Sequence, residues 1–488
     1  MIIIFDKRDA LSISLTVKKV KHRIRKRKMA SKLDPIHILL VSFPAQGHIN
    51  PLLRLGKCLA AKGASVIFTT TEKGGKTMRI INKLATPIGD GSLMFQFFDD
   101  GLPDYAHPLD HHKKIELLGR QFVSEMIKNH ADSNKPISCV INNPFFPWVS
   151  DVAFEHNIPS ALLWTNSIAV FTVCYDYVHK LVPFPSNEEP YIDVQLNSSI
   201  VLKYNEIPDF IHPFCPYPIL GRLTTAQIKD MSKVFCVLVD TFEELEHDFI
   251  DYISEKSITI RPVGPLFKNP KANGASNNTL GDFTSSNDDC NIIEWLNTKA
   301  KGSVVYISFG TVVYLPQVQV NEIAYGLLDS QVTFLWAKKQ HDDLPDGFLE
   351  EISERGKVVK WSPQEEVLAH PSVACFISHC GWNSSMEAIT LGVPMLTVPT
   401  FGDQLTNAKF LVDVFGVGIR LRRGERKLVT RDEMKKCLLE ATTGEQAERL
   451  KKNAMKWKKA AEEAVAIGGS SDRHLDAFME DIKKHKRC

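Results

Sequence analysis

The sequence predicts an α/β protein made of two doubly wound parallel sheets, each in its own Rossmann-like domain. Three observations lead to this prediction. Short apolar runs alternate with amphipathic helical stretches, which is typical of buried parallel strands joined by helices. A stretch rich in Asn, Gly, Ser and Pro interrupts this alternation once, and the alternation then starts again. The length of 488 residues is enough for two domains with separate cores.

The first domain is predicted to span residues 29–262. Its strands are expected at "IHILLVSF" (36–43), "ASVIFTT", "ISCVIN" (137–142), "SALLWT" (160–165) and "VFCVLVDT" (234–241). The turn "PAQGHINP" and the helix "LLRLGKCLAAKG" follow the first of these strands. Such a strand, turn and helix is the opening unit of a doubly wound sheet, in which ligands bind beyond the carboxyl ends of the strands.

Residues 263–289 are predicted to form an interdomain linker, and residues 290–465 the second domain. The strands of the second domain are expected at "SVVYISFG" (303–310), "VTFLWAKK", "KVVKW", "VACFIS" and "VPMLTVP". A helix is expected at "QVQVNEIAYGLLDS". The last segment, 466–488, is predicted to be a helix that packs back toward the N-terminal domain.

Charge is distributed unevenly along the chain. Residues 1–28 hold ten Lys or Arg and two Asp or Glu, whereas the remainder holds 49 basic and 55 acidic residues. We interpret 1–28 as a basic leader that is disordered or non-native, with Met29 as the working start; a nuclear, membrane-surface or organellar address is the alternative. The mildly acidic body gives no reason to expect nucleic acid as a partner.

Cysteine usage and hydropathy bear on localisation. The ten cysteines are scattered and include no CxxC pair, which is typical of a reduced, cytoplasmic protein. No run of about 18 apolar residues occurs, so no stable membrane insertion is expected. We expect a monomer.

The sequence lacks two familiar phosphate-binding signatures and contains one histidine cluster with metal-like spacing. "EKGGKTMR" fails as a P-loop because the first glycine of that motif would fall at Thr70, and no G-x-G-x-x-G follows the first strand. His107, His111 and His112 have metal-like spacing, but solvated loop histidines are commoner. No metal site is predicted.

A strand-to-helix junction carries the strongest signal for a ligand. His379, Gly381, Trp382 and Asn383 stand between the strand "VACFIS" and the helix "SSMEAIT". A helix N-terminus collects backbone N–H groups without partners and the positive end of the helix dipole, which suits an anion. Each of these residues taken alone is more often a packing or capping residue.

The wider segment from Trp361 to Gln404 reads "WSPQEEVLAHPSVACFISHCGWNSSMEAITLGVPMLTVPTFGDQ". It resembles the signature box of plant family-1 UDP-glycosyltransferases, and the resemblance extends from about Ile36 to the end of the chain. The resemblance implies the GT-B fold, in which two Rossmann-like domains face a cleft. It also implies a UDP-sugar as co-substrate, with no cofactor.

The chemistry of the individual residues agrees with a UDP-sugar. Trp361 offers a flat face for uracil, and base stacking on an aromatic ring contributes about 1–3 kcal/mol. We expect Gln364 to contact the nucleotide, Thr311 the phosphates, and Glu387, one turn after Asn383, the ribose. The diphosphate is expected to bind His379 and the backbone N–H groups of Trp382, Asn383 and Ser384. The sugar is expected to contact Asp403 and Gln404.

The resemblance also assigns roles in the N-terminal domain. In the family, a His after the first strand is the general base and an Asp orients it; His48 matches the His, whereas Asn143 stands at the place of the Asp. An Asn cannot stabilise an imidazolium as a carboxylate does. A carboxylic acid acceptor, already ionised at neutral pH, would tolerate this change. Phe145, Phe146 and Trp148 are candidates for the acceptor pocket.

Three segments, "NNPF.PW", "SFGTVVYLPQ" and "LVSFPAQGHINPLLRLGK", resemble the branch of the family that makes glucose esters of hydroxycinnamic, hydroxybenzoic or limonoid acids. The predicted function is therefore an inverting, UDP-glucose-dependent glucosyltransferase that acts on small aromatic or terpenoid acids. Gln404 favours UDP-glucose, since family members that prefer this donor usually carry Gln there. The alternatives are a glucosyltransferase acting on flavonoid or terpenoid hydroxyls, a non-catalytic UDP-sugar-binding protein, and an unrelated two-domain α/β binding protein.

Overall fold

A computed structural model describes residues 36–78, 84–103, 107–109, 111–196, 200–215, 218–268, 289–311, 313–338, 344–424 and 426–485. The chain divides into two compact units, residues 1–36 and 37–488. All elements named below lie in the second unit. The leader 1–28 and most of the predicted linker, 269–288, lie outside the described residues. The domain boundaries given above stay predictions.

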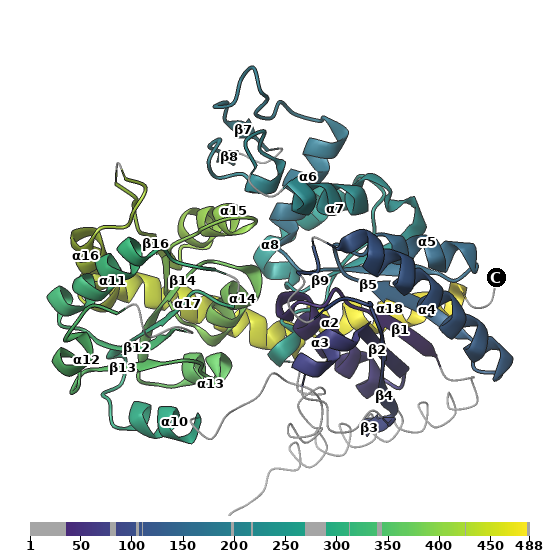
Figure 1. The fold of residues 1–488 in the computed structure, drawn as a ribbon, viewed down its shortest axis with the longest axis horizontal. Coiled ribbons are helices and arrows are strands. Elements are labelled where there is room, and N and C mark those ends of the chain that lie inside the picture. The colour runs from purple at the N-terminus through teal and green to yellow at the C-terminus, as the bar shows by residue number, and fades with distance from the viewer. Residues whose placement is uncertain are drawn as a thin grey trace, which may run out of the picture. The chain divides into compact units, whose positions relative to one another are not determined.

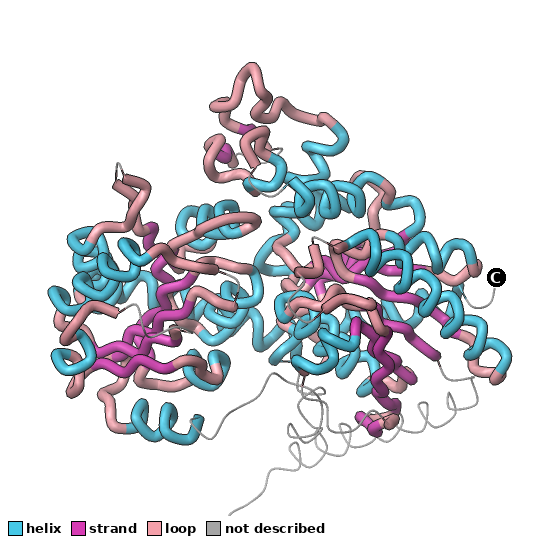
Figure 2. Tube along the Cα trace, viewed as in Figure 1, coloured by secondary structure: helices cyan, strands magenta, loops and turns pink. Residues whose placement is uncertain are grey.

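Two large sheets form the framework, and Figure 2 shows them as two groups of strands with helices around each. In the first sheet the spatial order is β10 (Ile260–Pro262), β9 (Val234–Val239), β6 (Ser160–Trp164), β5 (Ile137–Asn142), β1 (His37–Val41), β2 (Ser65–Thr71), β4 (Gly91–Phe98) and β3 (Thr86–Ile88). In the second it is β13 (Gly356–Val359), β12 (Thr333–Ala337), β11 (Val304–Ser308), β14 (Val373–Ser378), β15 (Met395–Thr397) and β16 (Gly418–Arg420). A short pair, β7 (Val194–Gln195) and β8 (Val201–Leu202), stands apart (Figure 1).

The helices fall into two sets. Those of the first sheet, which together with β1–β10 we call the N-terminal half, are α2 (Gln46–Ala61), α3 (Glu72–Thr77), α4 (His112–Asp132), α5 (Trp148–Glu155), α6 (Ile168–His179), η1 (Asp209–Ile211), α7 (Pro218–Lys229), η2 (Met231–Lys233), α8 (Glu243–Ser254) and η3 (Leu266–Lys268). Those that, with β11–β16, form the C-terminal half are α10 (Asp289–Asn297), α11 (Gln317–Ser330), α12 (Phe348–Glu351), α13 (Gln364–Ala369), α14 (Trp382–Leu391), α15 (Gln404–Lys409), η4 (Phe410–Val414), α16 (Arg431–Thr442) and α17 (Gly444–Val465). The last helix is α18 (Ser470–His485).

Within the two large sheets all strand pairs are parallel except the edge pair β3–β4, and the separate pair β7–β8 is antiparallel. Every residue of β1, β5 and β11 is buried, as expected for strands covered by helices on both faces. Glycine lets α2 approach its sheet closely: a Cβ at Gly56 would lie 2.7 Å from Leu40. The predicted α/β class and the two doubly wound sheets are confirmed.

Both sheets reverse their winding at one point. In the first sheet β1 lies between β2 and β5, and in the second β11 lies between β12 and β14. Ligands of doubly wound proteins bind beyond the carboxyl ends of the strands at such a reversal. His48 and Asn143 follow β1 and β5, whereas Gly310 and His379 follow β11 and β14. The topology therefore brings the candidate residues of each half to that half's reversal point.

The predicted strands are present: β5 and β14 have the predicted bounds, β2 has the predicted length shifted by one residue, and the others are shorter than the apolar runs that predicted them. The helix predicted at 317–330 is α11. Strands β3, β4, β7, β8, β10 and β16 were not predicted. Three of these, β3, β10 and β16, are three-residue edge strands, too short to show a periodic pattern. Within the part of the chain that the structure describes, no helix is both long enough and apolar enough to traverse a membrane.

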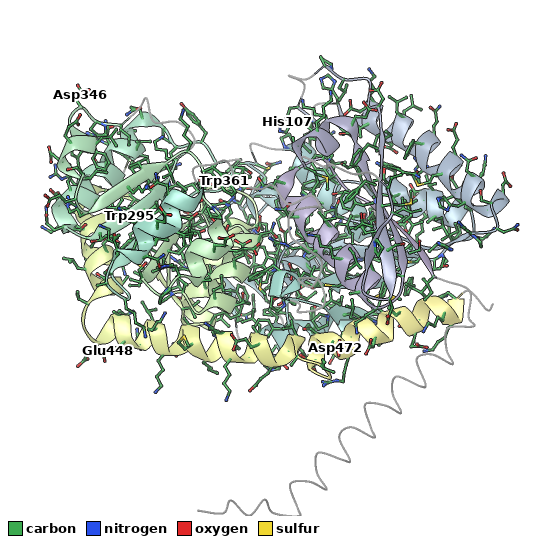
Figure 3. All side chains as sticks on the ribbon, turned by 90° about the horizontal axis from the view of Figure 1, so that it is seen from below. His107, Trp295, Asp346, Trp361, Glu448 and Asp472 are labelled. Atoms are coloured by element: carbon green, nitrogen blue, oxygen red, sulfur yellow. The ribbon has the colours of Figure 1, made fainter. Side chains whose placement is uncertain are left out.

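The chain ends on two long helices, α17 and α18, which Figure 3 shows following one another, with Glu448 near the start of α17 and Asp472 near the start of α18. Helix α18 contacts the N-terminal half. Lys62 pairs with Asp472 at 2.8 Å, and the Ser471 hydroxyl donates to the Gly264 carbonyl at 2.5 Å.

Candidate active site

His48 lies in the first turn of α2, beyond the carboxyl end of β1. Its imidazole packs edge-on against the ring of Phe43, with centroids 5.4 Å apart, and lies 4.7 Å from the ring of Phe145. Burial lowers the pKa of His48 to about 4, and among the described residues its buried Nδ1 has no hydrogen-bond partner. The imidazole is therefore neutral at neutral pH, able to accept a proton but only weakly basic.

Asn143 holds the loop that carries His48 but does not bond to the imidazole. Its Oδ1 accepts from the backbone N–H of Phe43 at 3.0 Å. Its Nδ2 donates to the Ser42 hydroxyl and to the backbone carbonyl of His48, both at 3.1 Å. The carboxamide ties the end of β5 to the β1–α2 loop, using donors that a carboxylate lacks, and the role of Asn143 as a catalytic partner stays a prediction.

The three aromatic residues after Asn143 differ in their surroundings. Phe146 and Trp148 are 2% and 3% exposed and belong to the core beneath the sheet, so their predicted place in the acceptor pocket is wrong. Phe145 is half-buried and lies against His48, with a positive φ of 81° that is unusual for a residue with a side chain. Of the three, Phe145 alone is placed to contact an acceptor.

His379 occupies a slot between two glycines. A Cβ at Gly381 would lie 2.6 Å from the His379 Nε2, and one at Gly310 would lie 2.9 Å from its Cε1. Burial lowers the pKa of His379 to about 4, and its Nδ1 is buried and, among the described residues, without a partner. A neutral imidazole held in this way can donate one N–H to a phosphate oxygen. Thr311, exposed and next to Gly310, lies on the same side of the sheet.

Helix α14 begins one residue after Gly381, and its first turn is the predicted diphosphate site. The backbone N–H of Trp382 donates to the Asp403 carboxylate, and its contact with the diphosphate stays a prediction. The N–H groups of Asn383 and Ser384 lie in the first turn, where a helix supplies no internal acceptor. The side chains of the first two residues reach the N-terminal half: the Trp382 Nε1 donates to the Asp240 carbonyl at 2.9 Å, and the Asn383 Nδ2 to the Gly47 carbonyl at 3.1 Å.

Glu387 lies one turn further along α14 and is held by Gln364. The Gln364 Nε2 donates to the Glu387 Oε2 at 2.7 Å and to the Ser384 hydroxyl at 2.9 Å, while its Oε1 accepts from the Tyr306 hydroxyl at 3.2 Å. Gln364 thus positions Glu387, and its amide is already engaged. Burial and then the neighbouring Glu365 raise the pKa of Glu387 to about 7.

Trp361 follows β13, and Figure 3 labels it at the edge of the C-terminal half. Its side chain is 37% exposed, which is unusual for an indole and leaves a face open for stacking. Trp361 and Gln364 are separated by two residues, so one short segment brings an aromatic face next to the carboxylate network of Glu387.

Asp403, which is half-buried, and Gln404, which is buried, follow β15. The Gln404 Oε1 accepts from the backbone N–H of Thr400 at 2.9 Å, from its hydroxyl at 2.7 Å and from the N–H of Phe401 at 3.2 Å. This fixes the carboxamide so that its nitrogen is the group able to donate to a ligand. The Asp403 carboxylate accepts from the Asn407 Nδ2 at 2.6 Å, and burial raises its pKa to about 6.

Two further residues of the site were not predicted. Arg54 of α2 pairs with Glu365 and lies 3.7 Å from Glu387. Asp240, at the end of β9, is buried, and burial raises its pKa to about 6. A signal for Arg54 was present in the sequence, because an arginine in the apolar helix "LLRLGKCLAA" needs a buried counter-charge.

The side chains of His107 and His112 both interact with the backbone of Leu109. The His107 Nδ1 accepts from the backbone N–H of Leu109 at 3.3 Å, and the His112 Nδ1 lies 2.9 Å from the Leu109 carbonyl. In the described ranges, no three His, Cys, Asp or Glu side chains gather as metal ligands.

Comparisons with known proteins agree with this geometry. Residues 241–460 match the family model described as "UDP-glucoronosyl and UDP-glucosyl transferase". The chain is 54% identical to a gallate 1-beta-glucosyltransferase of Punica granatum, over 92% of this chain and 89% of the relative. It is 53% identical to the limonoid UDP-glucosyltransferase of Citrus unshiu (92% and 90% covered) and 52% identical to a cinnamate beta-D-glucosyltransferase of Fragaria ananassa (92% and 83%).

Among solved structures, Os79 from O. sativa in complex with UDP is similar with a TM-score of 0.80 at 26% identity, covering 91% of this chain and 100% of that one. The Phytolacca americana UGT2 structure with UDP-2fluoro-glucose and pterostilbene has a TM-score of 0.76 at 24% identity and shares the fold. The resemblance found in the sequence and the GT-B architecture are thereby confirmed. The chain belongs to the UDP-glucoronosyl and UDP-glucosyl transferase family, the family-1 UDP-glycosyltransferases.

Proposed function

We propose that this protein transfers glucose from UDP-glucose to the carboxylate of a small aromatic or terpenoid acid and so forms a β-glucose ester. In one displacement, an acceptor oxygen attacks the anomeric carbon, the bond from this carbon to the diphosphate breaks, and UDP departs. A single displacement inverts the anomeric centre. No covalent enzyme intermediate, metal or cofactor is required, so full activity after exhaustive chelation is expected.

The observation that carries this proposal is the weakness of the base. His48 has a pKa of about 4, and Asn143 bonds to its backbone rather than to its ring. A phenol, with a pKa of about 10, needs a strong base before it can attack, whereas a carboxylic acid, with a pKa of about 4, is already an anion at neutral pH. A site with a weak base suits the acceptor that arrives ionised.

The names of the relatives point the same way. Those that are about half identical to this chain are named for gallate, cinnamate and limonoids. Gallate and cinnamate are aromatic acids. We infer that the acceptor of this protein belongs to the same chemical group, with Phe145 against its ring.

A matched set of acceptors tests the proposal. The full-length protein is incubated with UDP-glucose and gallate, with pyrogallol, which lacks only the carboxylate, and with methyl gallate, in which the carboxylate is blocked. We expect a product from gallate that mild alkali hydrolyses, and little turnover of the other two. Alkali-stable products from pyrogallol and methyl gallate would favour the hydroxyl-directed alternative. UDP-glucose binding without any product would favour a non-catalytic sugar-nucleotide-binding protein.

Donor choice is tested separately. We assign the sugar to Asp403 and Gln404, whose carboxamide the 400–401 loop orients. UDP-glucose should outcompete UDP-galactose and UDP-glucuronate when the three are supplied together. A preference for either of the other two donors would contradict the assignment.

We also propose that the protein works as a monomer in the cytoplasm. Buried thiols such as those of Cys139, Cys174 and Cys236 support a reducing compartment. Fractionation of the source tissue, and light scattering of the purified protein, test the two statements.

A further inference from the structure

Arg54 lies in the middle of α2, and its side chain, 15% exposed, crosses to two glutamates of the C-terminal half. Its Nη2 pairs with Glu365 of α13, and its Nη1 lies 3.7 Å from Oε1 of Glu387 on α14. The guanidinium also lies over the ring of Phe267, 5.6 Å from the centroid. A long side chain held at three points is positioned rather than free to sample solvent.

The surroundings of Glu387 explain why an arginine is needed there. Its side chain is 9% exposed, and the carboxylates of Glu365 and Asp240 act on it from α13 and from the end of β9. Tyr306 of β11 is a neutral neighbour, and burial raises its pKa to about 12. Arg54 and the hydrogen bond from Gln364 oppose the effect of these carboxylates, because both favour the ionised form of Glu387.

The charged groups of the other elements packed on α14 act on its ends. Asp403, just before α15, accepts from the N–H of Trp382 at the first residue. Lys451 of α17 donates to the Gly392 carbonyl at the C-terminal end, at 3.0 Å. Arg54 is therefore the cation that faces Glu387 among the groups described around it.

The same two helices meet at a second point. The Asn383 Nδ2 donates to the Gly47 carbonyl at 3.1 Å, and Gly47 precedes His48 in α2. Gly47 and Arg54 are seven residues apart, about two helical turns, and Asn383 and Glu387 are one turn apart on α14. The helix that carries the predicted base is thus joined to the predicted nucleotide-binding helix at two successive positions.

We propose that Arg54 is a positioning residue for donor binding: it holds the Glu387 carboxylate ready to accept hydrogen bonds from the ribose and ties the helix of His48 to the helix that binds UDP. The inference rests on the proposed use of UDP-glucose and on the ribose contact predicted for Glu387, but not on the identity of the acceptor. Since an ionised Glu387 accepts from ribose hydroxyls and a protonated one competes as a donor, donor affinity should depend on its ionisation.

The test is calorimetric titration with UDP-glucose, without acceptor, between pH 6 and 8.5. UDP-glucose is a suitable probe because its diphosphate is esterified at both ends and does not titrate in this range. Wild-type affinity should fall as the pH drops through about 7, the pKa of Glu387. In Arg54→Met the Kd at pH 7 should rise about 10-fold or more, the loss of one charge-assisted hydrogen bond, and the midpoint of the pH profile should move to higher pH.

Two further variants separate positioning from general stability. Glu365→Gln removes the neighbouring negative charge at a partly exposed site, so its midpoint should move to lower pH, opposite to Arg54→Met. Arg120→Met is the matched control, because Arg120 also bridges carboxylates, those of Glu116 and Asp151, none of which belongs to the donor site. Its affinity and pH profile should equal those of the wild type.

Each result of these titrations either supports or overturns the role inferred for Arg54. If Arg54→Met keeps the wild-type Kd and midpoint, the inference is overturned; if it does not fold, Arg54→Lys and Glu365→Gln carry the test. Midpoints that move in the same direction in Arg54→Met and Glu365→Gln also overturn it. Because no acceptor is present, a failed ester assay leaves this result standing, and a failed pH test leaves the ester assay standing.

Discussion

At the scale of single residues, the N-terminal half presents a histidine whose surroundings make it a poor base. His48 is packed between two phenyl rings, and burial lowers its pKa to about 4. A base of that strength removes little of the barrier when the acceptor must lose a proton, but it can still orient an acceptor that is already ionised.

The first prediction follows for His48→Ala. With gallate as acceptor, kcat/KM should fall by less than about 10²-fold, at or below the lower limit typical of general acid–base catalysis. The ratio of wild-type to variant kcat/KM should stay constant from pH 6 to 8, because the imidazole stays neutral there, and should change only as the pH approaches about 4. Initial rates across pH with gallate measure both. A loss above 10³-fold would show that His48 acts as a full general base.

Asn143 serves the same loop through geometry. Its Nδ2 donates to the His48 carbonyl, and a carboxylate at that place has no hydrogen to donate. We therefore expect Asn143→Asp to destabilise the fold by about 1–3 kcal/mol, because a buried carboxylate would face a carbonyl oxygen. Denaturant unfolding measures this, with Asn129→Asp on the exposed face of α4 as the control that should change little. Equal stability of Asn143→Asp and wild type would contradict the bonding described here.

At the scale of elements, the start of α14 depends on two glycines that leave room for one ring. Gly310 has a φ of 71°, which other residues rarely adopt, whereas Gly381 has an ordinary φ of −59°. A substitution at Gly381 therefore reports on space alone. Its Cβ would lie 2.6 Å from the His379 Nε2, so the imidazole must move.

We expect Gly381→Ala to weaken UDP-glucose binding about 10-fold or more, the loss of one hydrogen bond to a charged group, with the fold retained. Calorimetry measures the affinity and circular dichroism the fold. Gly424→Ala is the matched control, because a Cβ there would meet nothing closer than 3.8 Å. His379→Ala should lose a similar amount, and combining it with Gly381→Ala should add little. Wild-type affinity in Gly381→Ala would remove His379 from the diphosphate site.

At the scale of the whole molecule, several carboxyl groups are buried with raised pKa values. Burial raises them to about 6 for Asp240 and Asp403 and to about 7 for Glu246 and Glu387. When the pH lies between the pKa of the unfolded state and that of the folded state, such a group binds more protons in the folded protein. The stability that it contributes is therefore lost as the pH rises through the folded pKa. His48 and His379, with pKa values lowered to about 4, act in the opposite sense, but only below their unfolded pKa of 6.5.

Above pH 6.5 the two histidines therefore no longer affect how stability changes with pH, and of the two kinds of group only the carboxyl groups do. We expect the Tm of the ligand-free protein to fall between pH 6.5 and 8, and Glu246→Gln to reduce that slope. Glu448→Gln, on an exposed position of α17, is the control and should leave the slope unchanged. Thermal unfolding followed by circular dichroism supplies the values. A Tm that rises across this interval would mean that these carboxyl groups are ionised at little cost in the folded protein.

The sequence alone determined the features that depend on local pattern. Buried parallel strands are continuous apolar runs, so most strands of both sheets could be located from the positions of those runs along the chain. Apart from Thr311, the predicted donor residues lie within one 44-residue box, and two short strand-to-helix segments bring Trp361, His379 and Glu387 to one side of the second sheet.

Only the tertiary structure decided which distant groups meet and what burial does to them. Arg54 and Glu365 are 311 positions apart, and no periodicity relates them. Phe146 and Trp148 differ from Phe145 in burial although they are close neighbours in the chain, because the turn after β5 directs them into the core. The Asn143 side chain bonds to the His48 carbonyl and not to its ring, and the pKa values of His48 and Glu387 follow mainly from desolvation. Contacts and desolvation depend on how sheets and helices pack, which local sequence does not encode.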